Sequence, residues 1–166
     1  MVRDKELKRL ENYAKALGVK ITKQKKKKED PEAAWVVDGS EIIIFTSVKE
    51  SKTQLILKIV HEMAHHKSWI ANGRKQDLRT NQALIRDDER DSKIDPPLPK
   101  SQRKLISETE KNDMKYWDDI IKELNIRIKP SIINKAKKLD LWVYEYYYKK
   151  GEYPTSKEYK EKKKCL

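Results

Sequence analysis

The residues best suited to chemistry form the sequence His61-Glu62-Met63-Ala64-His65, which follows the pattern H-E-x-x-H. On a helix, positions 61 and 65 differ by only about 40° around the axis, so both imidazoles leave one face about one turn apart. They can therefore bind the same metal ion. Glu62 projects roughly 100° away, from where its carboxylate can reach a water molecule beside the metal without being a ligand. This pattern predicts zinc-assisted hydrolysis of an amide bond, with His61 and His65 as ligands and Glu62 as the general base.

The composition around the motif favours this interpretation. All three histidines of the 166-residue chain lie between positions 61 and 66. The surrounding segment is strongly apolar, and histidine and glutamate side chains are costly there unless they serve a purpose. The competing interpretation is a pair of core histidines beside a surface glutamate. His66 points about 100° away from His65. His66 could contact the substrate, or it could simply lie beside the site without a role in the chemistry. We favour the second interpretation.

A catalytic zinc site needs a third protein ligand. No histidine follows His66 and the single cysteine lies next to the C-terminus, so the ligand is expected to be a carboxylate. The segment ETEKNDMKYW offers Glu108, Glu110 and Asp113. On a helical projection Glu110 shares a face with apolar residues, namely Ile106, Met114, Trp117, Ile121 and Leu124. Glu108 falls on a more polar side, so we prefer Glu110 and keep Glu108 as the alternative. The competing role for Glu110 is a capping box with Ser107.

A helix and a small sheet are predicted before the motif. Apolar residues recur at helical spacing within residues 4–17, and Gly18 follows as a stop signal. A first strand is expected directly after this glycine. Two β-branched runs within residues 33–46 flank Asp38 and Gly39, a dipeptide that is typical of the type I′ turn of a β-hairpin.

The motif itself lies in a predicted helix over residues 51–70. Ser51 and Gln54 have the spacing of a capping box at its start. A broad apolar stripe follows, which indicates a helix that is mostly buried. Asn72 and Gly73 are expected to end it.

The remaining sequence predicts an insertion, further helices and a tail. Residues 73–100 are rich in charge and finish with three prolines, so we expect a charged, exposed insertion. Helical patterns follow over residues 101–124 and after Pro130. Residues 149–166 contain many lysines and are expected to form a basic flexible tail. We therefore predict a single metallopeptidase-like domain over residues 1–148.

The composition excludes several classes of protein. A single cysteine, Cys165, excludes an intramolecular disulfide framework and a cysteine-based zinc ribbon. No apolar run approaches the ~20 residues of a transmembrane helix. The charged start MVRDKELKRL lacks the apolar core of a signal peptide, so a cytoplasmic protein is expected.

The chain is strongly basic, with 39 Lys and Arg against 27 Asp and Glu and a net charge of +12. Lysine runs such as Lys25 to Lys28 and Lys160 to Lys164 could contact the phosphates of a nucleic acid, and tyrosines stand among lysines near the C-terminus. Solvated lysine faces are the more common explanation, so a nucleic-acid partner is open but not favoured. A thermophilic source and an AT-rich coding sequence fit the lysine content equally.

The helix QLILKIVHEMAHHKSW, preceded by a predicted hairpin and followed by an E-x-E helix, resembles the ImmA/IrrE family of small zinc metallopeptidases. The resemblance covers about residues 1–125. It implies a small zincin-like α+β domain with an N-terminal helix, a small and mostly antiparallel sheet, the motif helix and further C-terminal helices. It also implies a gluzincin-like zinc site with His61, His65 and Glu110 as ligands and Glu62 as the general base.

The expected function is therefore that of a zinc-dependent endopeptidase acting on a protein or peptide. Members of the family are often carried by phages or mobile elements and act on regulatory proteins such as repressors. Zincins align substrate along an edge strand, for which the strand at 40–46 is the candidate by resemblance. SprT-like proteases on DNA are a second resemblance, but they use a downstream histidine ligand that this chain lacks. The alternative function is a basic nucleic-acid- or regulator-binding protein with a structural or vestigial zinc site.

Overall fold

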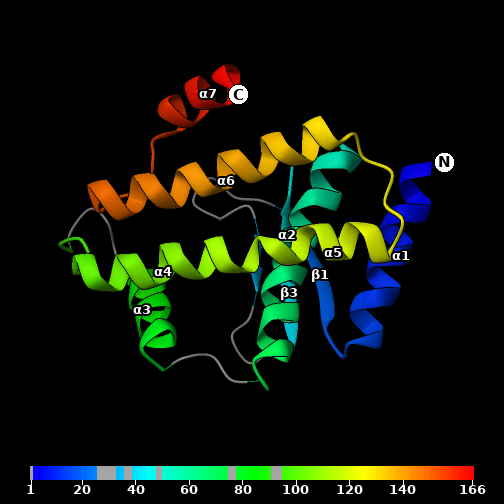
Figure 1. Ribbon diagram of the computed structural model, residues 1–166, viewed down its shortest axis with the longest axis horizontal. Helices are drawn as coiled ribbons and strands as arrows, with labels where there is room; N and C mark the ends of the chain where they lie inside the picture. The colour runs from blue at the N-terminus through cyan, green and yellow to red at the C-terminus, as the bar shows by residue number, and fades with distance from the viewer. Residues whose placement is uncertain (1, 26–32, 36–38, 48–49, 75–77, 91–94) are drawn as a thin grey trace. The chain divides into compact units, whose positions relative to one another are not determined.

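The computed structural model describes residues 2–25, 33–35, 39–47, 50–74, 78–90 and 95–166 (Figure 1). The chain divides into two compact units, of which the first comprises residues 1–74 and 113–129 and the second comprises residues 75–112 and 130–166. Helices predominate beside one small sheet, so the structure is of the α+β type in its coarse composition. Among the described residues, no helix combines the length and the apolar character that crossing a bilayer requires.

The first unit begins with helix α1 (Val2–Ala16), which confirms the predicted N-terminal helix. Gly18 has a φ of +80°, a conformation that glycine adopts without steric cost, and it ends the helical run. Strand β1 (Lys20–Lys25) follows at once, as expected. Leu10, Ala14 and Val19 are buried, so the helix packs its apolar stripe into the core of this unit.

The sheet has three strands in the order β1-β3-β2, with β3 (Glu41–Thr46) in the centre. Strand β2 (Ala33–Trp35) pairs with β3 in antiparallel fashion, from Trp35 opposite Ile42 to Ala33 opposite Ile44. This register is symmetric about the midpoint of positions 38 and 39, which confirms the predicted hairpin. Gly39 has a φ of +74°, as such a turn requires, whereas Asp38 lies outside the described residues.

The expectation of a mostly antiparallel sheet is wrong. Strand β1 pairs with β3 in parallel fashion over its whole length, from Lys20 opposite Glu41 to Lys25 opposite Thr46. A parallel pair needs a long connection, and the chain between β1 and β3 contains β2. The strand at 40–46 is consequently central and paired on both sides, so it is not the edge strand that the resemblance implied.

Helix α2 (Lys52–Ala71) carries the H-E-x-x-H motif and is the central helix of the first unit. Its predicted capping box is confirmed. The Ser51 side chain accepts a hydrogen bond from the Gln54 backbone N–H, and the Gln54 side chain accepts one from the backbone N–H of Ser51. The helix packs against α1, the sheet and α5 (Lys115–Glu123), so it is buried on several sides. Its fully buried apolar side chains are Ile56, Ile59, Val60 and Met63.

The second unit contains helices α3 (Leu78–Glu89), α4 (Lys100–Asp113), α6 (Pro130–Lys150) and α7 (Ser156–Cys165). Residues 73–100, expected to be exposed, contribute buried side chains here. Ala83 and Leu98 form a cluster with Ile106 of α4 and Tyr147 of α6. The sequence gives little sign of this packing, because most residues of α3 are polar or charged and only a few apolar side chains of the segment join the buried cluster.

Two further differences concern helix ends. The single helix predicted over residues 101–124 is interrupted at Met114, where α4 gives way to α5. The segment for which the sequence predicts a flexible tail contains α7, whose first turn is capped by Thr155 and Glu158 in a second capping box. The S/T-x-x-E spacing of this pair is a start signal that the lysine content obscured.

Candidate metal centre

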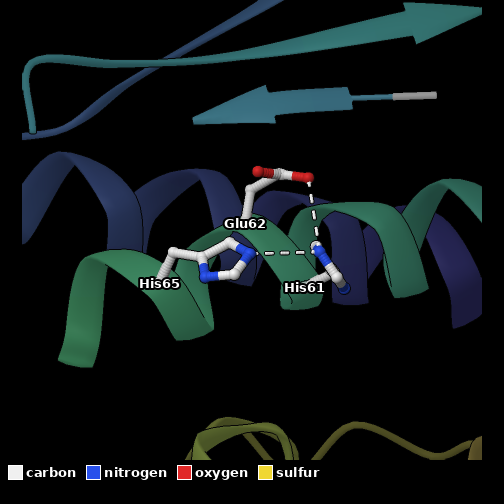
Figure 2. A group of neighbouring side chains, drawn as sticks. All are labelled: His61, Glu62 and His65. Carbon is white, nitrogen blue, oxygen red and sulfur yellow. Dashed lines mark hydrogen bonds and ion pairs between the residues drawn. The ribbon is translucent and has the colours of Figure 1, made fainter. Parts of the chain in front are cut away.

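Three side chains of α2 that can bind a metal ion bring their ligand atoms close together. The ligand atoms of His61, Glu62 and His65 all lie within 4.8 Å of one another. Figure 2 shows the two imidazole rings turned toward each other along the helix, with the Glu62 carboxylate bent toward His61. The H-E-x-x-H spacing thus brings its two histidines and its glutamate together, as the helical periodicity predicts.

The two imidazoles present the same nitrogen to a common point. His61 Nε2 and His65 Nε2 are 3.1 Å apart, and their rings meet at an angle of 80°. Two nitrogen ligands on one tetrahedral zinc ion, with bonds of 2.0–2.1 Å, are separated by about 3.3 Å. The distance in this structure is close to that value, so the pair fits a zinc ion.

Asp113 fixes the orientation of His65. Its Oδ2 lies 2.8 Å from His65 Nδ1, and the Asp113 side chain is buried. An ionised carboxylate only accepts hydrogen bonds, so the network assigns the proton to Nδ1. The lone pair of His65 Nε2 is then directed toward His61, as metal binding requires. Because Asp113 contacts the nitrogen on the far side of the ring, it orients the ligand and does not share its metal-facing position.

Trp117 supports the other imidazole. Its ring meets that of His61 edge to face, with centroids 5.6 Å apart and an interplanar angle of 87°. Trp117 is buried, so this contact limits the rotation of the His61 ring. Asp113 ends α4 just before α5 begins, and Trp117 lies in the first turn of α5, which packs on α2 within the first unit. One short segment therefore positions both histidines.

Sequence reasoning assigned neither role. The sequence offers Asp113 only as one of three carboxylate candidates for a metal ligand, and it predicts only a core-facing position for Trp117. Their spacing was the available signal, because positions 113 and 117 are one helical turn apart and can reach one partner helix together.

The Glu62 carboxylate lies near the imidazoles but does not form a hydrogen bond with the nearer one. Its Oε1 lies 3.9 Å from His61 Nε2, which is beyond hydrogen-bonding distance. The side chain is only 8 % exposed, so its carboxylate faces the interior beside the nitrogen pair. A carboxylate at this position can accept a proton from a water molecule held near the two nitrogens.

Glu110 and Glu108 lie on α4 in the second unit. Glu110 is buried, whereas Glu108 is exposed and pairs with Lys104, as the helical projection predicts. The capping role considered for Glu110 is excluded, because Ser107 and Glu110 stand in the interior of a helix that begins at Lys100. The assignment of Glu110 as the third ligand stays a prediction.

His66 is buried against Trp69, with ring centroids 5.5 Å apart. Burial lowers the pKa of its imidazole, which favours the neutral form. At 1 % exposure it cannot contact a substrate directly, so the position merely beside the site describes it better.

Comparison with known proteins found no match to this chain among protein-family models, curated proteins or solved structures. Two imidazole nitrogens form a borderline-soft pair that suits zinc, and a buried carboxylate stands beside them.

Proposed function

We propose that this protein is a zinc-dependent endopeptidase. The observation that carries the proposal is the pair of Nε2 atoms 3.1 Å apart, with one imidazole oriented by Asp113. His61 and His65 would hold the zinc ion, and Glu110 is the proposed third ligand. The assignment of Glu110 rests on the helical projection of the sequence, which places it on the face of Ile106, Met114 and Trp117.

The zinc ion, when bound, lowers the pKa of a water molecule and polarises the carbonyl of the scissile bond. The protein supplies the proton transfers and the orientation. Glu62 Oε1 takes a proton from the attacking water and delivers it to the amide nitrogen as that nitrogen leaves. Asp113 keeps the proton of His65 on Nδ1 throughout, and Trp117 restrains the ring of His61.

The proposed substrate is a protein or peptide chain. Within the described residues β2 is paired only with β3, and it packs against α2, so its outer edge is the proposed place for an extended substrate. Backbone hydrogen bonds along such an edge bind without strong sequence preference. By the resemblance to phage-borne ImmA/IrrE proteins, a regulatory protein inside the cell is the proposed natural target.

The test combines metal content with peptide hydrolysis. We expect near-stoichiometric zinc in the purified protein and cleavage of a proteome-derived peptide library, read by mass spectrometry. Glu62→Gln should keep zinc and lose cleavage, because the amide cannot accept the proton. Glu110→Ala should lose zinc, whereas Glu108→Ala, an exposed control on the same helix, should keep it.

Three results would contradict the proposal. Purified protein without zinc, and with no affinity for added zinc, would remove the metal site. Zinc-loaded protein with the same cleavage in wild type and Glu62→Gln would assign that cleavage to a contaminant or to another site. Binding of zinc with no cleavage at all would favour the alternative of a structural or vestigial zinc site.

A further inference from the structure

A second charged site lies in the first unit, formed by residues that the proposed hydrolysis does not use. A pocket of about 200 Å³ is lined by Lys5, Glu6 and Arg9 of α1 and by Arg127, which follows α5. At roughly 30 Å³ for each water molecule, it has room for a tetrahedral oxyanion. Three cationic side chains and one carboxylate border it, so the lining carries a net positive charge.

The segment that carries Arg127 is held in place by its backbone. The Glu6 carboxylate is 2 % exposed and accepts a hydrogen bond of 2.6 Å from the Arg127 backbone N–H. Ile126 and Ile128 on either side are buried. The backbone N–H of Ile128 donates to the carbonyl of Ile126 at 3.1 Å, so the chain turns at Arg127, which is exposed between the two buried isoleucines and lines the pocket.

Arg9 is also fixed independently of any ligand. Its Nη1 donates to the backbone carbonyls of Leu124 and Asn125 at the C-terminal end of α5, at 3.3 Å each. Cationic groups at this end of a helix satisfy free carbonyls and interact favourably with the helix dipole. A guanidinium has five N–H donors, so others are available to a second partner. Lys5 precedes Arg9 by one turn of α1 and lies on the same face.

We propose that this pocket binds a phosphate group, either free or as part of a larger phosphate ester. Guanidinium groups recognise phosphate through paired, charge-assisted hydrogen bonds. The Arg9 guanidinium and the backbone of Arg127 are already held by hydrogen bonds, so less conformational freedom is lost when an anion binds. The site is independent of the proposed zinc chemistry, because it uses residues of α1 and a residue beyond the C-terminal end of α5, none of which contacts His61, Glu62 or His65 through an interaction described above.

The experiment is a titration with inorganic phosphate at constant ionic strength, followed by the amide NMR signals of Glu6 and Arg127. We expect saturable shifts at these signals in the wild type. Lys5→Gln and Arg127→Gln should each weaken binding about tenfold, as loss of one charge-assisted bond predicts. Lys8→Gln, an exposed α1 lysine outside the pocket lining, should bind phosphate like the wild type.

A second arm uses a short single-stranded oligonucleotide without terminal phosphates. If it competes with inorganic phosphate and loses affinity in Arg127→Gln, the ligand class is a phosphodiester. If phosphate binds and the oligonucleotide does not compete, the class is free phosphate or a monoester. A linear response without saturation, or equal affinities in Lys5→Gln, Lys8→Gln and Arg127→Gln, would overturn the proposal. The cations would then serve only to neutralise the buried carboxylate of Glu6.

Discussion

The substitution Asp113→Asn gives the sharpest test of the arrangement around His65. The Asp113 Oδ2 to His65 Nδ1 distance is 2.8 Å, and the two side chains are only 9 % and 13 % exposed. A hydrogen bond to a charged partner, sheltered from water in this way, contributes about 1.5–3 kcal/mol. Asparagine keeps the shape and an acceptor oxygen but removes the charge. It therefore retains part of that stabilisation and no longer dictates which nitrogen carries the proton.

The expected result is zinc binding that is about 10- to 100-fold weaker, which corresponds to about 1.4–2.7 kcal/mol. The assay is competition for zinc with a chromophoric chelator at fixed pH. Asp119→Asn is the matched control, because Asp119 is an exposed carboxylate on α5 and should leave zinc affinity unchanged. Circular dichroism checks that both variants are folded.

A second readout needs no metal. Nitrogen NMR of the metal-free wild type should show His65 with its proton on Nδ1, and Asp113→Asn should shift the population toward the Nε2–H form. Equal zinc affinity in wild type and Asp113→Asn would refute the reasoning. So would a wild-type His65 that carries its proton on Nε2, because Asp113 would then not direct the metal-facing lone pair.

Two further predictions concern the first unit. Gly39→Ala should lower the free energy of unfolding by about 2–4 kcal/mol, because a Cβ would lie 2.6 Å from the Trp69 ring at a φ of +74°. Gly73→Ala, with a φ of +69° and open space around it, should cost only about 1 kcal/mol in the same urea titration. The hydrogen bond from Lys67 lowers the pKa of Glu123 below its ordinary 4.5, so the folded state binds a proton at this carboxylate less readily than the unfolded state does. The ionised carboxylate therefore stabilises the fold above pH 4.5, and this stabilisation is lost as the pH falls from 4.5 through the lowered pKa. In Glu123→Gln, the free energy of unfolding should therefore fall less at acid pH than in the wild type. The difference should be less than about 1 kcal/mol, because this carboxylate is 48 % exposed. Identical pH dependence of unfolding in variant and wild type would contradict the prediction.

The sequence predicts a structural feature correctly where the interactions that form it lie between residues close together in the chain. The capping box of Ser51 and Gln54 and the convergence of His61 and His65 depend on groups within one helical turn. The hairpin that contains Gly39 likewise depends on its turn residues, and its pairing follows.

Whether a local pattern forms a helix cap depends on where the helix begins. Ser107 with Glu110 and Thr155 with Glu158 have the same S/T-x-x-E spacing, yet only the second pair caps a helix. The difference is where free backbone N–H groups occur. They occur only in the first turn, and α4 begins well before Ser107.

The grouping of His61, Glu62 and His65 was predictable from the sequence alone, because one turn of helix α2 brings them together wherever that helix lies. The tertiary structure alone decided which side chains orient them. Asp113 meets His65 from 48 positions away, and Trp117 meets His61, because α5 packs on α2. The parallel pairing of β1 with β3 was decided in the same way. The pattern of a strand records which face is buried and carries no information on the direction of its neighbour.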